Sequence, residues 1–148
     1  MEKIKINNSR LIIDLTPIKT FAEKIGKRYP FLLSIYLYGS VARGDADKES
    51  DIDILIIAEG NPSEIYLILF EDEDYKNLED WAFEIVEGGL SILICNEKEI
   101  TQHFDTLINK ILIEGILLHG TNLEVILSKY PTKHDAHESN LLDLMKTL

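Results

Sequence analysis

The chain has 148 residues, of which 45% are hydrophobic and 28% charged, and its formal net charge at pH 7 is −11. This length and balance predict one globular domain with a hydrophobic core. The acidic charge argues against non-specific nucleic-acid binding and against contact with an anionic membrane surface. Phosphate binding by so acidic a chain would require a local basic group or a metal cation.

Helices and strands are expected to alternate along the chain. Thr16-Pro17 is a helix-start pattern, with Thr16 as the cap, and this helix is expected to end before Pro30. Residues 31–38 and 51–58 are rich in aliphatic and aromatic side chains and predict two strands. The second strand is apolar on both faces, which favours a central position in a sheet covered by helices. The segment EIYLILF, residues 64–70, fits a helix and a strand equally well.

The second half of the chain continues the alternation. Residues 78–85 have helical spacing, residues 90–95 predict a third strand, and the apolar residues between 100 and 112 form a helical stripe. An apolar helix is expected around residues 111–118, with a further short helix within 121–130. The sequence therefore predicts an α/β (α+β) domain over residues 1–130, with a small mixed sheet flanked by helices. In the tail, residues 131–148, the segment LLDLMKTL can form a short docking helix.

Two localisation signals point the same way. The single cysteine, Cys95, lies in an apolar run and cannot form an internal disulfide, which favours a reducing compartment. The N-terminal residues lack the apolar region of a signal peptide, and no apolar stretch approaches the length of a membrane span. A cytoplasmic protein without membrane contact is therefore expected.

The candidate site lies in residues 39–53, GSVARGDADKESDID. Asp51 and Asp53 stand two positions apart at the start of a strand, so their side chains point to the same face, with Cα atoms about 7 Å apart. Neighbouring carboxylates repel each other, and a hard cation such as Mg²⁺ removes that penalty because it takes oxygen ligands. Without further signals, such a pair is more often a solvated strand end.

The residues upstream strengthen the interpretation as a metal and phosphate site. Gly39 and Ser40 follow a strand directly, where a turn without a side chain lets backbone N–H groups approach a phosphate. Ser40 adds a hydroxyl, Arg43 adds a planar cation suited to phosphate oxygens, and Gly44 adds a second permissive turn.

Other metal sites match less well. An EF-hand loop beginning at Asp45 would need Gly at its sixth position and Glu at its twelfth, where this chain has Ser50 and Ile56. His134 and His137 stand three residues apart, but they lie in the polar tail without a third ligand.

The pattern Gly-Ser, ten residues, Asp-x-Asp resembles the signature of the polymerase-β-like nucleotidyltransferase superfamily. More narrowly, GSxARG with SDID resembles the minimal nucleotidyltransferase (MNT) proteins of bacteria and archaea. The specific motif covers residues 39–53, and the later strand and ILIEGILLHG, residues 111–120, fit more loosely. The resemblance implies the nucleotidyltransferase fold for most of the chain.

The resemblance also assigns roles to the motif residues. Gly39 and Ser40 would hold the triphosphate of a nucleotide, with ATP the expected one, while Arg43 can touch phosphate and Asp51 and Asp53 would bind Mg²⁺. The implied reaction is attack by an acceptor hydroxyl on the α-phosphorus with release of pyrophosphate. In such sites two cations about 4 Å apart stabilise the entering and leaving oxygens.

One expected residue of the superfamily is missing. The superfamily usually has a third carboxylate on a later strand, and the strand 90–95 places Ser91 at that position. Serine is a poor Mg²⁺ ligand, which puts the second ion and activation of the acceptor in question. Glu84 and Glu87 are nearby substitutes, although both fit a solvated helix face better.

Three functional hypotheses remain open. The first is a nucleotidyltransferase whose acceptor is a separate HEPN-type partner protein, because the resemblance implies such partners and some MNT proteins transfer AMP onto them as antitoxins. The second is a non-catalytic regulatory or partner-binding module that has lost the third carboxylate. The third is transfer to a small molecule such as an aminoglycoside. The sequence leaves the acceptor, the base preference and the oligomeric state open.

Overall fold

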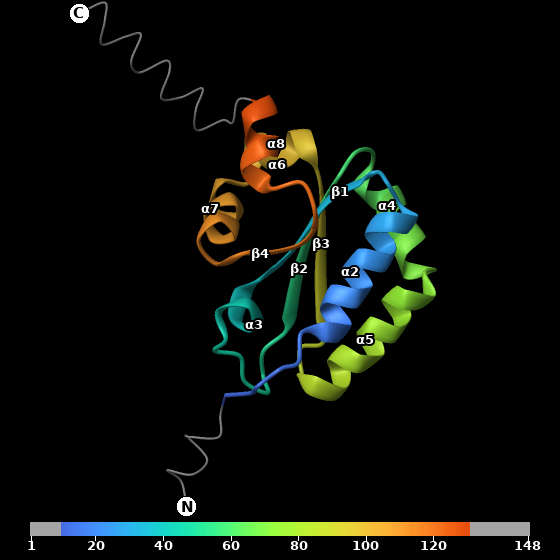
Figure 1. Cartoon of the computed structure of the whole chain (residues 1–148), viewed down its shortest axis with the longest axis vertical. Helices are drawn as coiled ribbons and strands as arrows, with labels where there is room; N and C mark the ends of the chain where they lie inside the picture. The colour runs from blue at the N-terminus through green and yellow to red at the C-terminus, as the bar shows by residue number, and fades with distance from the viewer. Residues whose placement is uncertain (1–9, 131–148) are drawn as a thin grey trace, which may run out of the picture.

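The computed structural model describes residues 10–130 of the chain (Figure 1). A four-stranded sheet in the order β3-β2-β1-β4 lies between two groups of helices. The predicted fold class, a small mixed sheet flanked by helices, is confirmed. The domain boundary at residue 130 stays a prediction, and the expected docking helix and the His134/His137 pair lie outside the described residues. Within residues 10–130, no helix is long and apolar enough to cross a membrane.

The sheet contains both strand directions. β1 (Leu32–Tyr38) pairs antiparallel with β2 (Ile52–Ala58) on one side and with β4 (Ile116–Gly120) on the other. β2 in turn pairs in parallel with β3 (Leu90–Asn96). As a result, the end of β1 and the starts of β2 and β3 meet at one edge of the sheet.

Each face of the sheet is covered by its own group of helices (Figure 1). One face is covered by α2 (Thr16–Arg28), α4 (Pro62–Phe70) and α5 (Glu73–Ile85). The other face is covered by α6 (Glu97–His103), α7 (Asp105–Glu114) and α8 (Leu123–Lys129). A short helix, α3 (Gly39–Arg43), follows β1 directly and begins the connection to β2.

Two apolar layers result from the alternation of side chains along the strands. Ile54 and Ile56 of β2 are fully buried against the α2-α4-α5 side, whereas Leu55 and Ile57 are fully buried against the α6-α7-α8 side. Successive strand residues point to opposite faces. Asp53 therefore lies on the same side of the sheet as α7.

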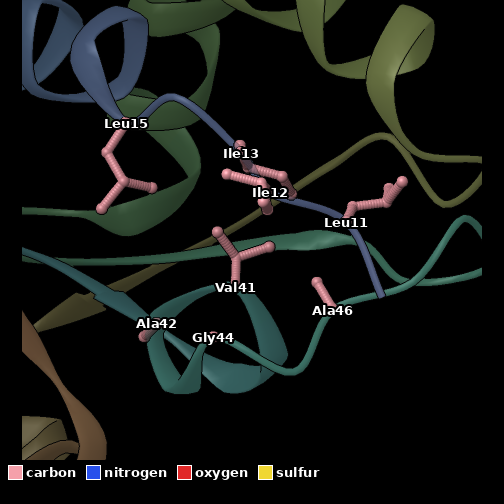
Figure 2. A pocket seen from close by; sticks show the side chains of 8 residues that line it. All are labelled: Leu11, Ile12, Ile13, Leu15, Val41, Ala42, Gly44 and Ala46. Atoms are coloured by element: carbon pink, nitrogen blue, oxygen red, sulfur yellow. The ribbon is translucent and has the colours of Figure 1, made fainter. Parts of the chain in front are cut away.

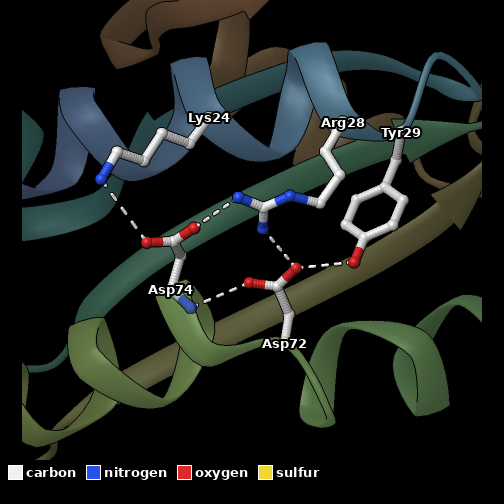
Figure 3. A network of polar contacts seen from close by, with 5 residues as sticks. All are labelled: Lys24, Arg28, Tyr29, Asp72 and Asp74. Carbon is white, nitrogen blue, oxygen red and sulfur yellow. Dashed lines mark hydrogen bonds and ion pairs between the residues drawn. The ribbon is translucent and has the colours of Figure 1, made fainter.

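On the α2-α4-α5 side of the sheet, a buried carboxylate connects α2 with α5 (Figure 3). Asp72, whose side chain is 3% exposed, accepts hydrogen bonds from Arg28 and from the Tyr29 hydroxyl, both at 2.6 Å. It also caps α5 by accepting from the backbone N–H of Asp74 at 2.9 Å. Arg28 makes a second ion pair to Asp74 at 2.7 Å. This network fixes the end of α2 to the start of α5.

Three local expectations were wrong or incomplete. The expected helix over residues 111–118 is not formed, because α7 ends at Glu114, Gly115 is extended, and β4 pairs with the otherwise open edge of β1. The helical stripe between residues 100 and 112 is divided at Phe104 into α6 and α7. Thr16 begins α2 but does not cap it, since Leu15 is at the N-cap position and Asp14 accepts the Thr16 N–H at 2.9 Å.

Candidate functional site

The end of β1 and the start of β2 bring Gly39 and the two aspartates together. Asp51 lies directly before β2, and Asp53 is the second residue of β2, where it pairs with Tyr38 at the end of β1. Gly39 begins α3 with a φ of +77°, and a Cβ atom there would collide with the Oδ2 atom of Asp53. Glycine at this position therefore allows both the turn and the close approach of the Asp53 carboxylate to the backbone.

The far end of α3 is fixed by a second glycine. Gly44 has a φ of +82° and donates its N–H to the carbonyl of Ser40 at 3.0 Å. The N–H of Asp45 donates to the same carbonyl at 3.1 Å. Ser40 itself is half-buried at the second position of α3, one residue from Gly39. The sequence-predicted residues Gly39, Ser40 and Gly44 are thus parts of one turn beside Asp53.

Asp45 and Asp47, two other acidic residues of the motif, make local contacts within the loop between α3 and β2. Asp45 pairs with Arg43 at 3.2 Å. Asp47 accepts the N–H of Glu49 at 2.9 Å and donates its own N–H to the Ser50 hydroxyl at 3.0 Å. These contacts form a local turn of the kind that aspartate and serine side chains stabilise.

The carboxylates of Asp51 and Asp53 are crowded. Burial, together with the neighbouring Asp51 carboxyl, raises the pKa of Asp53 to about 7, against the opposing effect of the Lys110 charge. Burial and the charges of Asp53 and Asp51 also raise the pKa of Tyr38 to about 12. An unneutralised pair of this kind destabilises its own charged form, and a bound cation would relieve it.

The carboxylates of Asp51 and Asp53 can hold Mg²⁺ only if a bound substrate supplies further oxygen ligands. Mg²⁺ is commonly bound by one or two carboxylates together with substrate phosphates. Within residues 10–130, no group of three or more His, Cys, Asp or Glu side chains is arranged to hold a metal ion. The two carboxylates fit Mg²⁺ if phosphate oxygens and water complete its coordination.

Ser91 lies beside Asp53 in the sheet. In the parallel ladder between β2 and β3, Ser91 is the partner of Asp53, and its side chain is exposed. Glu84 and Glu87 are also exposed, and the backbone N–H of Glu87 donates to the carbonyl of Lys48 at 2.7 Å. The identification of Ser91 with the third carboxylate position of the superfamily stays a prediction.

Two charged residues of α7 join this region, and the sequence analysis missed both. Arg43 Nη1 lies 2.9 Å from Glu114 Oε2, and the Glu114 side chain is only 12% exposed. Lys110, one helical turn before Glu114, is exposed, and its positive charge acts on Asp53. Their i, i+4 spacing places them on one helix face, but nothing in the sequence shows that this face is turned to Asp53.

A separate apolar cavity of about 330 Å³ lies on another side of α3 (Figure 2). Its wall combines the segment before α2 with α3 and the following loop: Leu11, Ile12, Ile13, Leu15, Val41, Ala42, Gly44 and Ala46. None of these side chains is charged, and neither Asp51 nor Asp53 takes part. The cavity is therefore distinct from the aspartate site.

Comparison with known proteins gives one family and several solved structures. The nucleotidyltransferase domain family model matches residues 18–146. A crystal structure of a toxin-antitoxin with AMP-PNP is 18% identical, with 91% of this chain and 94% of that chain covered and a TM-score of 0.48. The toxin-antitoxin MntA-HepT is 17% identical, with 87% and 90% covered and a TM-score of 0.43. The tri-AMPylated Shewanella oneidensis HEPN toxin in complex with MNT antitoxin is 18% identical, with 87% and 92% covered and a TM-score of 0.39.

No curated protein has a significant sequence match to the chain. The identities and TM-scores of the solved structures are low, so the family assignment rests on the family model. That model spans most of the chain and includes the Gly39-Ser40 turn together with Asp51 and Asp53. The chain belongs to the nucleotidyltransferase domain family.

Proposed function

We propose that this chain is a Mg²⁺-dependent minimal nucleotidyltransferase that binds a nucleoside triphosphate, with ATP the expected one, and transfers its nucleoside monophosphate to a hydroxyl acceptor. The observation that carries the proposal is the close approach of the Asp53 carboxylate to the backbone of Gly39, with Asp51 beside it. The membership in the nucleotidyltransferase domain family supports it.

Each part of the turn has a role in this proposal. Gly39 and Ser40 hold the triphosphate through backbone N–H groups and the Ser40 hydroxyl, and Gly44 ends α3 so that the loop can return to β2. Asp51 and Asp53 hold Mg²⁺ together with the phosphates. When bound, Mg²⁺ neutralises charge on the phosphates and stabilises the entering and leaving oxygens.

The reaction is an in-line displacement. The acceptor oxygen forms a bond to the α-phosphorus, the bond from that phosphorus to the pyrophosphate oxygen breaks, and the hydroxyl proton passes to solvent. Pyrophosphate is the leaving group. The chain contributes by positioning the triphosphate against Asp51 and Asp53 and by neutralising charge, which are the main contributions in phosphoryl transfer.

The acceptor that we propose is a separate protein of the HEPN type, which gives the chain an antitoxin-type role in the cytoplasm. The resemblance of GSxARG and SDID to the MNT proteins supports this choice. The Shewanella oneidensis complex pairs a HEPN toxin with an MNT antitoxin. Its similarity to this chain is too low to support the choice, which therefore rests on the sequence motif.

A non-catalytic binding module is the second candidate. The observation that favours it is Ser91, which is the direct partner of Asp53 in the sheet and supplies no carboxylate. Such a module would bind a nucleotide or a partner protein without turnover.

The test measures binding and transfer separately. Titration calorimetry with Mg²⁺-ATP is performed on the wild-type chain, on the double variant Asp51→Asn/Asp53→Asn, and on Glu49→Gln as an exposed acidic control from the same loop. We expect Mg²⁺-dependent binding by the wild type and Glu49→Gln, and none by the double variant. Label from [α-³²P]ATP should then appear on an added HEPN-type protein. Binding without label transfer would favour the binding module, and no binding by folded wild type would overturn the nucleotide site.

A further inference from the structure

The face of α7 that carries Lys110 is turned toward α3. Ile108 and Ile111 are buried against the sheet, and Glu114, which follows Ile111 by three residues, contacts Arg43 at 2.9 Å. Lys110 lies four residues before Glu114, so both side chains leave the helix on the same flank. This flank faces the turn that Gly39 begins.

The charge of Arg43 is already matched by two carboxylates. Asp45 lies 3.2 Å from its Nε atom and Glu114 lies 2.9 Å from its Nη1 atom. Within residues 10–130, Lys110 forms no ion pair, in contrast to Arg43. A triphosphate at the aspartates would therefore meet the full charge of Lys110 and a largely neutralised Arg43.

The position of Lys110 also meets the electrostatic need of the site. The chain carries a net charge of −11, and two of its carboxylates, those of Asp51 and Asp53, lie at the place where phosphates would bind. An exposed lysine is a flexible point charge that reaches phosphate oxygens without a fixed geometry. The field of Lys110 already acts on Asp53.

We propose that Lys110 is a nucleotide-binding residue of this site and contacts the triphosphate from α7, while Glu114 holds Arg43 and keeps α7 against α3. This inference rests on the proposed function and adds to it a residue outside the sequence motif.

The test compares Lys110→Ala, Lys110→Arg and Lys110→Gln with Lys76→Ala in the full chain. Lys76 is the matched control, because it is an exposed lysine within α5, on the opposite face of the sheet. Calorimetry with Mg²⁺-ATP should show at least about tenfold weaker binding for Lys110→Ala and Lys110→Gln, the loss expected for a hydrogen bond to a charged group. Lys110→Arg should stay within about threefold of the wild type because it keeps the positive charge, and Lys76→Ala should bind like the wild type.

A second titration with Mn²⁺ alone separates phosphate contact from general damage to the site. Removal of a cation near two carboxylates should leave Mn²⁺ affinity unchanged or increased, whereas Asp53→Asn should lose it. Equal Mg²⁺-ATP affinity in Lys110→Ala and the wild type would overturn this inference and leave the proposed function in place. A parallel loss of Mn²⁺ binding in Lys110→Ala would overturn it too, because Lys110 would then act on the shape of the site. A wild-type chain that binds no Mg²⁺-ATP would overturn the proposed function and this inference together.

Discussion

Asp53 and Ser91 are direct partners in the parallel ladder between β2 and β3. The two side chains lie on the same face of the sheet, Asp53 half-buried and Ser91 exposed at the side of α7. A carboxylate at position 91 would therefore stand beside Asp51 and Asp53 without any movement of the backbone. Serine at this position adds no negative charge to a site where two carboxylates already lie close together.

Replacement of Ser91 by aspartate should add a third carboxylate beside Asp51 and Asp53. We expect Ser91→Asp to bind Mn²⁺ roughly tenfold more tightly, as an added oxygen ligand at a two-carboxylate site implies. In the absence of metal, the same variant should be less stable than the wild type because three like charges repel. Mn²⁺ calorimetry and thermal melts with and without metal test both effects. Unchanged Mn²⁺ affinity in a folded Ser91→Asp variant would show that position 91 does not reach the ion.

Gly39→Ala should disturb the site more than the corresponding change at Gly44. Both glycines have positive φ values, so each substitution carries a backbone cost of about 1–2 kcal/mol in the free energy of unfolding. Only at Gly39 does the added Cβ collide with Asp53, whereas nothing lies within 4 Å of a Cβ at Gly44. Chemical denaturation should therefore show a larger destabilisation for Gly39→Ala than for Gly44→Ala. Mg²⁺-ATP titration should show a much larger loss of nucleotide binding for Gly39→Ala. Equal nucleotide affinities would contradict the packing described here.

Asp53→Asn should stabilise the metal-free protein while abolishing its response to metal. The substitution removes the repulsion by Asp51 and the cost of burying a charge, which together act on Asp53. We expect the Tm without metal to rise by about 2–4 °C, the change that corresponds to roughly 1 kcal/mol in a domain of this size. Added Mg²⁺ should raise the Tm of the wild type and of Glu49→Gln, but not that of Asp53→Asn. A lower Tm for Asp53→Asn without metal would mean that the carboxylate has a structural role in the fold.

Asp72→Ala should be strongly destabilising, because the change leaves two donors and a helix cap without their acceptor. The variant removes the partner of the Tyr29 hydroxyl, one ion pair of Arg28, and the cap of α5. We expect a loss of about 2–4 kcal/mol in the free energy of unfolding, measured by urea denaturation. Asp74→Asn is the control, since its side chain is 24% exposed and its ion pairs should contribute less than about 1 kcal/mol. Equal effects of the two variants would contradict the central place of Asp72 in the network.

The same carboxylate makes stability depend on pH. Burial alone would raise the pKa of Asp72, but hydrogen bonds from Tyr29, Arg28 and the Asp74 N–H outweigh it and lower the pKa below its ordinary value. Because the folded-state pKa is the lower one, the contribution is complete above the unfolded pKa of about 3.9 and is lost as the pH falls through the folded-state value. The stability difference between wild type and Asp72→Asn should therefore shrink as the pH is lowered from about 6 to about 3. A difference that stays constant over this range would exclude the charge of Asp72 as its source.

Local patterns were sufficient for most of the fold and for the motif that defines the candidate site. The first three strands are dense runs of apolar residues, and the Gly-Ser turn and the aspartate pair are defined by spacing within residues 39–53. The segment EIYLILF left two choices open, and the structure makes it α4. Asn61 decides this locally, because its side chain accepts the N–H of Ser63 at 2.8 Å and so caps the helix.

The remaining parts depend on contacts between distant residues. β4 is short and partly exposed, and it becomes a strand by pairing with β1, where Leu37 meets Ile116. The helix predicted for that segment followed the local apolar pattern, which long-range pairing overrides. The places of Lys110 and Glu114 depend on the same pairing, so the spacing of α7 alone did not connect them with Asp53.

The late position of β4 in the chain also determines the order in which the strands of the sheet are synthesised. β1, the Gly-Ser turn and β2 all leave the ribosome within residues 32–58, whereas the strand that covers the other edge of β1 comes at Ile116–Gly120. About 60 residues separate the two, which corresponds to roughly 3–12 s at ordinary elongation rates. During that interval the nascent hairpin presents an open strand edge to other chains, a known route to misassociation. This edge of β1 therefore stays without its partner strand until the residues that follow α7 are made.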